Sequence, residues 1–70
     1  MRGVISKVFA DKGYGFIRDE EGMSRFMHAS QVSPGMFDLL RRGTHVEFTP
    51  VEHEKGNRAE NVRVLLKESA

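Results

Sequence analysis

Four side chains able to stack on flat ring systems lie at alternate positions in two short stretches of the sequence. Tyr14 and Phe16 stand in the first stretch, and Phe26 and His28 stand in the second. Alternate residues of a β-strand share a face, so each stretch would present two rings to the same side of a sheet. Rings on an open face can stack nucleobases, at about 1–3 kcal/mol per base. The chemistry to consider first is therefore non-covalent recognition of unpaired flat rings.

A hairpin would bring the two stretches together. Polar residues at positions 19–24 separate them, and symmetric pairing about Glu21 places Phe16 opposite Phe26 and Tyr14 opposite His28. Side chains that face each other across two strands lie about 4.5–5.5 Å apart, which predicts one compact plate of four rings. The other face would carry smaller side chains: Gly15, Ile17, Met27 and Ala29.

The plate could face the core or the solvent, and aromatic side chains are usually buried. Two features favour solvent. Tyr14 and His28 have polar tips that need partners when buried, and basic residues interleave with the rings, as is typical of nucleic-acid surfaces. These basic residues are Arg2, Lys7, Lys12 and Arg18. Same-face residues of a strand lie about 6.8 Å apart, whereas duplex bases rise about 3.4 Å, so the plate suits splayed, single-stranded bases.

Turn signals recur every eight to twelve residues, between short runs rich in Val, Ile, Phe and Tyr. This pattern is typical of an all-β barrel or sandwich. The predicted strands cover residues 2–9, 13–18, 25–29, 44–51 and 59–65. The stretch 33–43 is predicted to be a loop with a single turn of helix at most. The charge-rich stretch 52–58 is predicted to be a solvated hairpin loop.

The composition limits what the chain can be. Seventy residues predict one domain. The absence of cysteine excludes disulfides, cysteine zinc sites and a thiol nucleophile, and it favours a cytoplasmic protein. No apolar run approaches the roughly 20 residues of a membrane span. The net charge of only +1 means that binding to nucleic acid would need contacts beyond phosphate attraction.

Two motifs in the sequence resemble those of a known family. Residues 12–17, Lys-Gly-Tyr-Gly-Phe-Ile, resemble the first ribonucleoprotein motif of the cold shock domain family, and residues 25–30, Arg-Phe-Met-His-Ala-Ser, resemble its second. The similarity continues without a gap to about residue 64. It implies a five-stranded antiparallel OB-fold barrel that binds single-stranded RNA or DNA, and a role as an RNA chaperone or as a regulator of transcription or translation.

The resemblance also implies roles for particular residues. The residues at the family's base-stacking positions are Tyr14, Phe16, Phe26, His28 and Phe37. Lys12 and Lys55 stand at positions of basic contacts. Arg58, in the charge-rich stretch 52–58, is a further candidate for a phosphate contact.

The first strand departs from the family pattern. The family usually has Lys-Trp-Phe-Asn where this chain has Ser6-Lys7-Val8-Phe9. Lys7 therefore stands at the tryptophan position as a candidate contact. Phe9 is a candidate replacement ring, although one residue out of phase it could point to the other face. Ala29 replaces a further aromatic residue, and Arg25 stands at a position that is apolar and inward-facing in the family.

Other functions have weaker support. The three histidines lack metal-ligand spacing, so no metal or cofactor is predicted. Gly13-Tyr14-Gly15 lacks the signature of a phosphate loop, and His28 with Ser30 lacks an orienting third group, so neither an enzyme nor a small-molecule substrate is predicted. The main alternative is a protein-interaction module that uses the same ring face. A monomer and a strand-swapped dimer both stay open.

Overall fold

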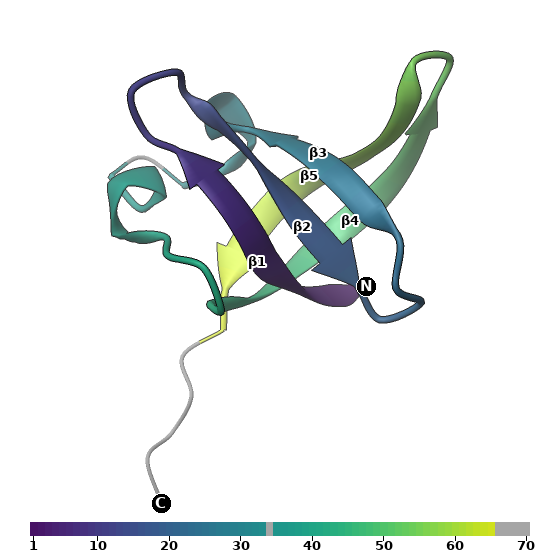
Figure 1. The fold of residues 1–70 in the computed structure, drawn as a ribbon, viewed down its shortest axis with the longest axis horizontal. Coiled ribbons are helices and arrows are strands. Elements are labelled where there is room, and N and C mark those ends of the chain that lie inside the picture. Colours follow the sequence, from purple (N-terminus) through teal and green to yellow (C-terminus); the bar gives the residue numbers. More distant parts are fainter. Residues whose placement is uncertain (34, 66–70) are drawn as a thin grey trace, which may run out of the picture.

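The computed structural model describes residues 1–33 and 35–65 as five strands that close into a barrel in the order β1-β2-β3-β5-β4 (Figure 1). The strands are β1 (Arg2–Phe9), β2 (Tyr14–Asp19), β3 (Ser24–His28), β4 (His45–His53) and β5 (Gly56–Val64). The predicted all-β barrel is confirmed, with one correction. The pairs β1–β2, β2–β3, β4–β5 and β1–β4 are antiparallel, but β3 and β5 pair in parallel where Phe26 meets Arg58.

The segments between the strands differ from the predictions at three places, the first being the predicted loop 19–24, where Asp19 and Ser24 belong to β2 and β3. The third strand ends at His28 rather than at Ala29, because a short 3₁₀ turn, η1 (Ala29–Gln31), follows it. The hairpin of β4 and β5 continues to His53 and Gly56, so most of the predicted loop at 52–58 is strand. In the stretch 33–43 a single 3₁₀ turn, η2 (Phe37–Leu39), confirms the predicted helical turn, while Pro34 lies outside the described residues.

The interior of the barrel is filled by aliphatic side chains. Burial alternates along β2, where Gly15 and Ile17 are buried while Tyr14 and Phe16 stay half-buried on the outer face. Burial of apolar surface is the main stabilising term, and here the rings of the hairpin are not its principal source. The buried apolar residues are Ile5, Ile17, Met27, Val32, Phe37, Leu40, Val46, Phe48, Ala59 and Val62.

Two local features of β1 and β2 set the geometry of the outer face. At Gly15 an added Cβ would lie 2.6 Å from the carbonyl oxygen of Lys7, so only glycine lets β1 approach β2 this closely. A register shift between Ile5 and Lys7 then places Lys7 opposite Phe16 and Phe9 opposite Tyr14. A shift of this kind reverses which residues face outward beyond it.

Within the described residues, no helix is long and apolar enough to cross a membrane.

Candidate nucleic-acid interface

Five rings form a continuous group on the outer face of β1, β2 and β3, which we call the ring cluster: Phe9, Tyr14, Phe16, Phe26 and His28. The predicted register is confirmed, with Tyr14 opposite His28 and Phe16 opposite Phe26. Ring centroids are 5.2 Å apart for Phe9 and Tyr14, 5.6 Å for Tyr14 and Phe26, and 6.5 Å for Phe26 and His28. Phe16 meets Phe26 at 5.9 Å with an interplanar angle of 75°. The edge-to-face contacts hold the rings in place while leaving faces open.

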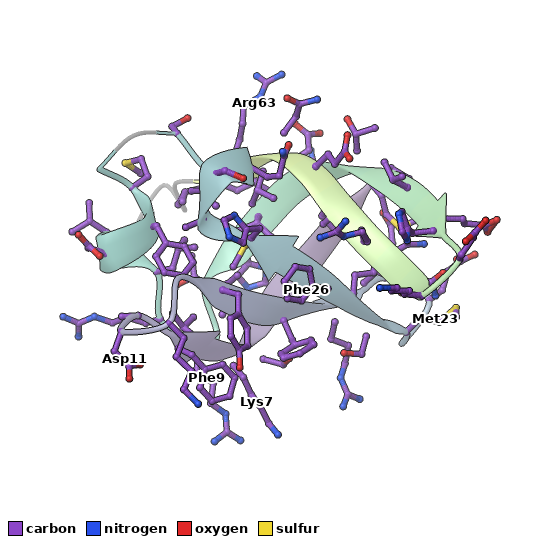
Figure 2. All side chains as sticks on the ribbon, turned by 90° about the horizontal axis from the view of Figure 1, so that it is seen from above. Lys7, Phe9, Asp11, Met23, Phe26 and Arg63 are labelled. Carbon is purple, nitrogen blue, oxygen red and sulfur yellow. The ribbon has the colours of Figure 1, made fainter. Side chains whose placement is uncertain are left out.

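Phe9 belongs to this cluster, so its side chain points to the same face as the other rings and not to the interior. Its centroid lies 6.4 Å from that of Phe16, and Lys7 lies two residues before it on the same outer face of β1. Figure 2 shows Lys7 and Phe9 extending from the same side of the barrel. The register shift in β1 therefore gives the chain a first-strand ring at Phe9, while Lys7 places an exposed ammonium beside it.

Basic side chains border the cluster at Phe9 and at Phe26. The Lys12 ammonium lies 6.0 Å from the centroid of Phe9, and the Arg58 guanidinium carbon lies 5.0 Å from that of Phe26. Cations over ring faces are attracted by the ring quadrupole. These two residues can therefore contact a phosphate or stack on a base next to the rings that they touch.

A small hollow of about 100 Å³ extends the cluster onto the hairpin of β4 and β5. It is lined by Phe26, His53, Lys55, Gly56, Asn57 and Arg58. The structure thus places Lys55 and Arg58 beside Phe26, and their predicted contact with phosphate stays a prediction. The positions of His53 and Asn57 in this hollow could not be predicted, since no local sequence pattern indicates that β5 lies beside β3.

Phe37 is placed apart from the other predicted stacking residues. Phe37 is the first residue of η2, is 8% exposed and packs in the core. In this conformation Phe37 offers little surface to a base, and its role in stacking stays a prediction.

His28 is oriented by its neighbour Ser30. The Ser30 backbone N–H donates to Nδ1 of His28 at 3.1 Å, and the Ser30 hydroxyl lies 2.8 Å from the same nitrogen. A ring nitrogen that accepts a backbone N–H carries no proton, so the neutral ring holds its proton on Nε2. The exposed His28 ring can therefore stack and can also donate one hydrogen bond outward.

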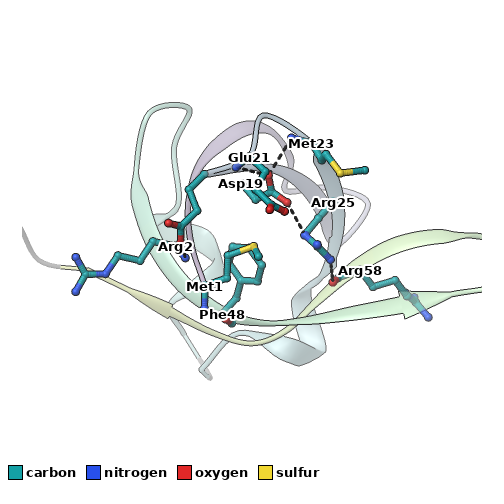
Figure 3. A network of polar contacts seen from close by, with 9 residues as sticks. Met1, Arg2, Asp19, Glu21, Met23, Arg25, Phe48 and Arg58 are labelled. Atoms are coloured by element: carbon teal, nitrogen blue, oxygen red, sulfur yellow. Dashed lines mark hydrogen bonds and ion pairs between the residues drawn. The ribbon is translucent and has the colours of Figure 1, made fainter.

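A buried ion pair joins the two strands of the β2–β3 hairpin (Figure 3). Nε of Arg25 donates to Oδ2 of Asp19 at 2.8 Å, and the side chains of the pair are 7% and 0% exposed. Oδ1 of Asp19 accepts the backbone N–H groups of Glu21 and Met23, both at 2.9 Å. Arg25 also donates to the backbone carbonyl of Arg58 at 3.2 Å. The pair therefore ties the β2–β3 turn to the strand that carries Arg58.

The ion pair also lowers the pKa of Asp19. The buried position of Asp19 corrects one prediction. The hydrogen bond from Arg25, reinforced by the N–H of Met23, holds the pKa of the Asp19 carboxyl below its ordinary value, against the opposing effect of desolvation. Asp19 was predicted to lie in a polar loop, but it is a buried residue at the end of β2. Arg25 does occupy an inward position, as its place in the sequence indicated.

A closed five-stranded barrel with an open aromatic face on β1, β2 and β3 defines a protein of the oligonucleotide-binding barrel class. Comparison with known proteins narrows the class. Residues 1–65 match the family model described as the 'Cold-shock' DNA-binding domain. The chain is 45% identical over 65 residues to a cold shock-like protein of Aquifex aeolicus, covering 91% of this chain and 93% of the relative.

Two further comparisons agree. A cold shock-like protein of Thermotoga maritima is 40% identical over 65 residues, covering 93% of this chain and 98% of the relative. The solved structure described as drosophila Unr CSD456 superposes with a TM-score of 0.72 at 26% identity, covering 99% of this chain and 28% of that one. The chain therefore belongs to the cold shock domain family, whose members bind nucleic acid.

Proposed function

We propose that residues 1–70 act as one cytoplasmic domain that binds single-stranded RNA or DNA by stacking unpaired bases on the ring cluster. The observation that carries the proposal is the position of five rings on an outer face, while the core is filled by other residues. The proposed biological role is that of an RNA chaperone or of a regulator of transcription or translation, and no catalytic role is proposed.

The spacing of the rings favours single strands over duplexes. Neighbouring centroids in the cluster are 5.2–6.5 Å apart. Bases in a duplex strand are stacked at about 3.4 Å and are held by their own neighbours. Bases that lie on successive rings of this cluster must therefore be unstacked from one another, which only a flexible strand allows.

A titration with heptathymidine tests the proposal. Tyr14 is the only tyrosine and the chain has no tryptophan, so its fluorescence reports on the cluster directly. We expect quenching at a one-to-one ratio, and no comparable change with a duplex of the same length. A protein that binds a peptide or a second copy of itself through this face, but no oligonucleotide, would instead be the protein-interaction module considered above.

The salt dependence of the same titration should be shallow. Four basic residues border the cluster closely: Lys7, Lys12, Lys55 and Arg58. If about two to four of them contact phosphates, log K should fall against log salt with a slope of about −1.5 to −3, at roughly −0.7 per contact. Stacking supplies the rest of the affinity. A slope steeper than about −5 would show that phosphate contacts dominate and that the proposed balance is wrong.

Replacing Lys7 by tryptophan should tighten binding of heptathymidine. Lys7 is exposed opposite Phe16, so an indole there would add one stacking surface, worth about 1–3 kcal/mol, and should flatten the salt slope by about 0.7. Thr49→Trp, at an exposed position on β4, is the matched control and should leave affinity unchanged. Unchanged or weaker affinity in a folded Lys7→Trp variant would mean that Lys7 does not border the binding surface.

A further inference from the structure

Two arginines that the proposed base-stacking surface does not use, Arg41 and Arg42, lie next to the outer edge of that surface. Both are exposed and precede Gly43 in the turn that leads to β4. A hollow of about 560 Å³ is lined by Lys7, Phe9, Leu40, Arg41 and Arg42 together with Ser6, Val8 and Ala10. Phe9, which belongs to the ring cluster, therefore also borders the two arginines.

Lys7 connects this hollow with two others. One of about 350 Å³ lies between Lys7, Phe9, Phe16 and Arg18, with Ser6 and Ser24. Another of about 460 Å³ is lined by Lys7, Arg18 and Arg42 among others. The three hollows share Ser6 and Lys7, so they form one path from the rings past β1 to the turn at Arg42. We call its four cations the basic track: Lys7, Arg18, Arg41 and Arg42.

The backbone holds the turn at a fixed place beside β1. The N–H of Gly43 donates to the carbonyl of Ile5 at 2.8 Å, and the N–H of Ile5 donates to the carbonyl of Thr44 at 2.8 Å. The N–H of Thr44 donates to the carbonyl of Arg41 at 2.9 Å, and the N–H of Arg41 donates to the Thr44 hydroxyl at 3.1 Å. These hydrogen bonds hold the backbone of Arg41 and Arg42 next to the register shift in β1.

The positive charge of the basic track contrasts with the net negative charge of the rest of the chain. Apart from these four cations, the chain has seven basic and ten acidic residues, a balance of −3. Asp38 is the acidic residue nearest to Arg41 in sequence, but no ion pair joins a track cation to a carboxylate within residues 1–33 and 35–65. A polyanion is therefore attracted toward this side of the barrel.

We propose that the basic track binds the phosphates of a single strand where it continues beyond Phe9, and so lengthens the binding site past the ring cluster. The inference rests on the proposed function, because the track begins where the stacking surface ends. Arginine suits the task, since its guanidinium donates two parallel hydrogen bonds to a phosphate. The track lacks exposed rings beyond Phe9, so it contacts backbone and not bases, and sequence has little influence there.

Oligonucleotides of two lengths test the proposal. Heptathymidine offers one base to each of the five rings and two bases more, whereas decathymidine has three further nucleotides that can reach the track. The wild-type protein should bind decathymidine more tightly, with a salt slope steeper by about 0.7–1.4, for one or two added phosphate contacts. Arg42→Glu should lower affinity for decathymidine by about 3- to 10-fold and remove about 0.7 of that added slope, with a much smaller change for heptathymidine.

Arg63→Glu is the matched control, because it makes the same change in net charge on the opposite side of the barrel from Lys7 and Phe9 (Figure 2). It should affect the two lengths equally and weakly. Arg41→Glu should act as Arg42→Glu does, and thermal melts check that each variant is folded. If Arg42→Glu weakened both lengths equally, as Arg63→Glu does, the track would be no binding site. Binding of heptathymidine with no gain for decathymidine would overturn the track alone, whereas binding of neither oligonucleotide would overturn the proposed function as well.

Discussion

Phe16→Ala and Phe26→Ala should each weaken binding of heptathymidine by about 1–3 kcal/mol, and the double variant should lose about 30-fold or more in affinity. Both rings lie at the centre of the ring cluster, and each contacts Tyr14 as well as the other, at centroid distances of 5.6–6.1 Å. Removing both takes away two stacking surfaces and loosens a third. Fluorescence or calorimetric titration measures the loss directly.

Thermal melts of the same variants separate a binding effect from a folding effect. The two rings are half-buried, so each substitution should cost less than the about 3–5 kcal/mol typical of a core phenylalanine. Leu39→Ala, which removes an apolar side chain that is 65% exposed on η2, is the control and should change neither affinity nor stability. If the phenylalanine variants failed to fold, the rings would be core residues, and the interpretation of an open stacking face would be wrong.

Arg25→Met should destabilise the fold strongly, with a fall in Tm of at least about 12 °C. The substitution keeps the volume of the side chain but removes the guanidinium that compensates the buried Asp19 carboxylate. It also removes the hydrogen bond to the backbone of Arg58, so β5 loses one of its connections to β3. Removing one partner of a buried ion pair leaves an unpaired buried charge, and this destabilises a fold far more than breaking an exposed ion pair does. Thermal unfolding at neutral pH checks the result.

A second substitution makes this prediction specific to the ion pair. Asp19→Asn added to Arg25→Met removes the unpaired charge, while its side-chain oxygen can still accept the N–H groups of Glu21 and Met23. The double variant should therefore be more stable than Arg25→Met alone, as expected for two coupled residues. If Arg25→Met were as stable as the wild type, the pair would make no net contribution.

The same pair should make stability depend on pH in the acid range. The folded pKa of Asp19 lies below its unfolded value, which is near about 3.9. Its ionised form therefore stabilises the fold above the unfolded value, and this stabilisation is lost as the pH falls through the folded pKa. The Tm of the wild type should drop more steeply between about pH 5 and pH 2 than that of the double variant. Parallel slopes would contradict the assignment.

The parts of the site that depend on local pairing could be predicted from sequence. Tyr14, Phe16, Phe26 and His28 belong to one hairpin, and its short polar connection and alternating pattern define the register. The position of Phe9 could not be predicted, because the register shift between Ile5 and Lys7 reverses the phase of β1 without a clear signal in the residues themselves.

Features that depend on closure of the barrel or on burial were missed for a physical reason. The parallel contact of Phe26 with Arg58 and the hollow between them arise only when the barrel closes. Asp19 reads as a loop residue, yet the inward position of Arg25 requires a buried anion nearby, and Asp19 is the acidic residue that the β2–β3 turn brings to it. The position of Arg41 and Arg42 beside β1 depends on backbone hydrogen bonds between their turn and Ile5, which the sequence alone does not indicate.

Removing the bases from the strand shows whether stacking on the ring cluster supplies most of the affinity. Heptathymidine and an abasic strand of the same length carry the same phosphates, so a titration of each at about 0.1 M salt isolates the contribution of stacking. Several stacks of about 1–3 kcal/mol each should make the abasic strand bind at least about 100-fold more weakly, with no quenching of Tyr14 fluorescence. Equal affinity for the two strands would mean that the protein binds the backbone alone and that stacking contributes nothing.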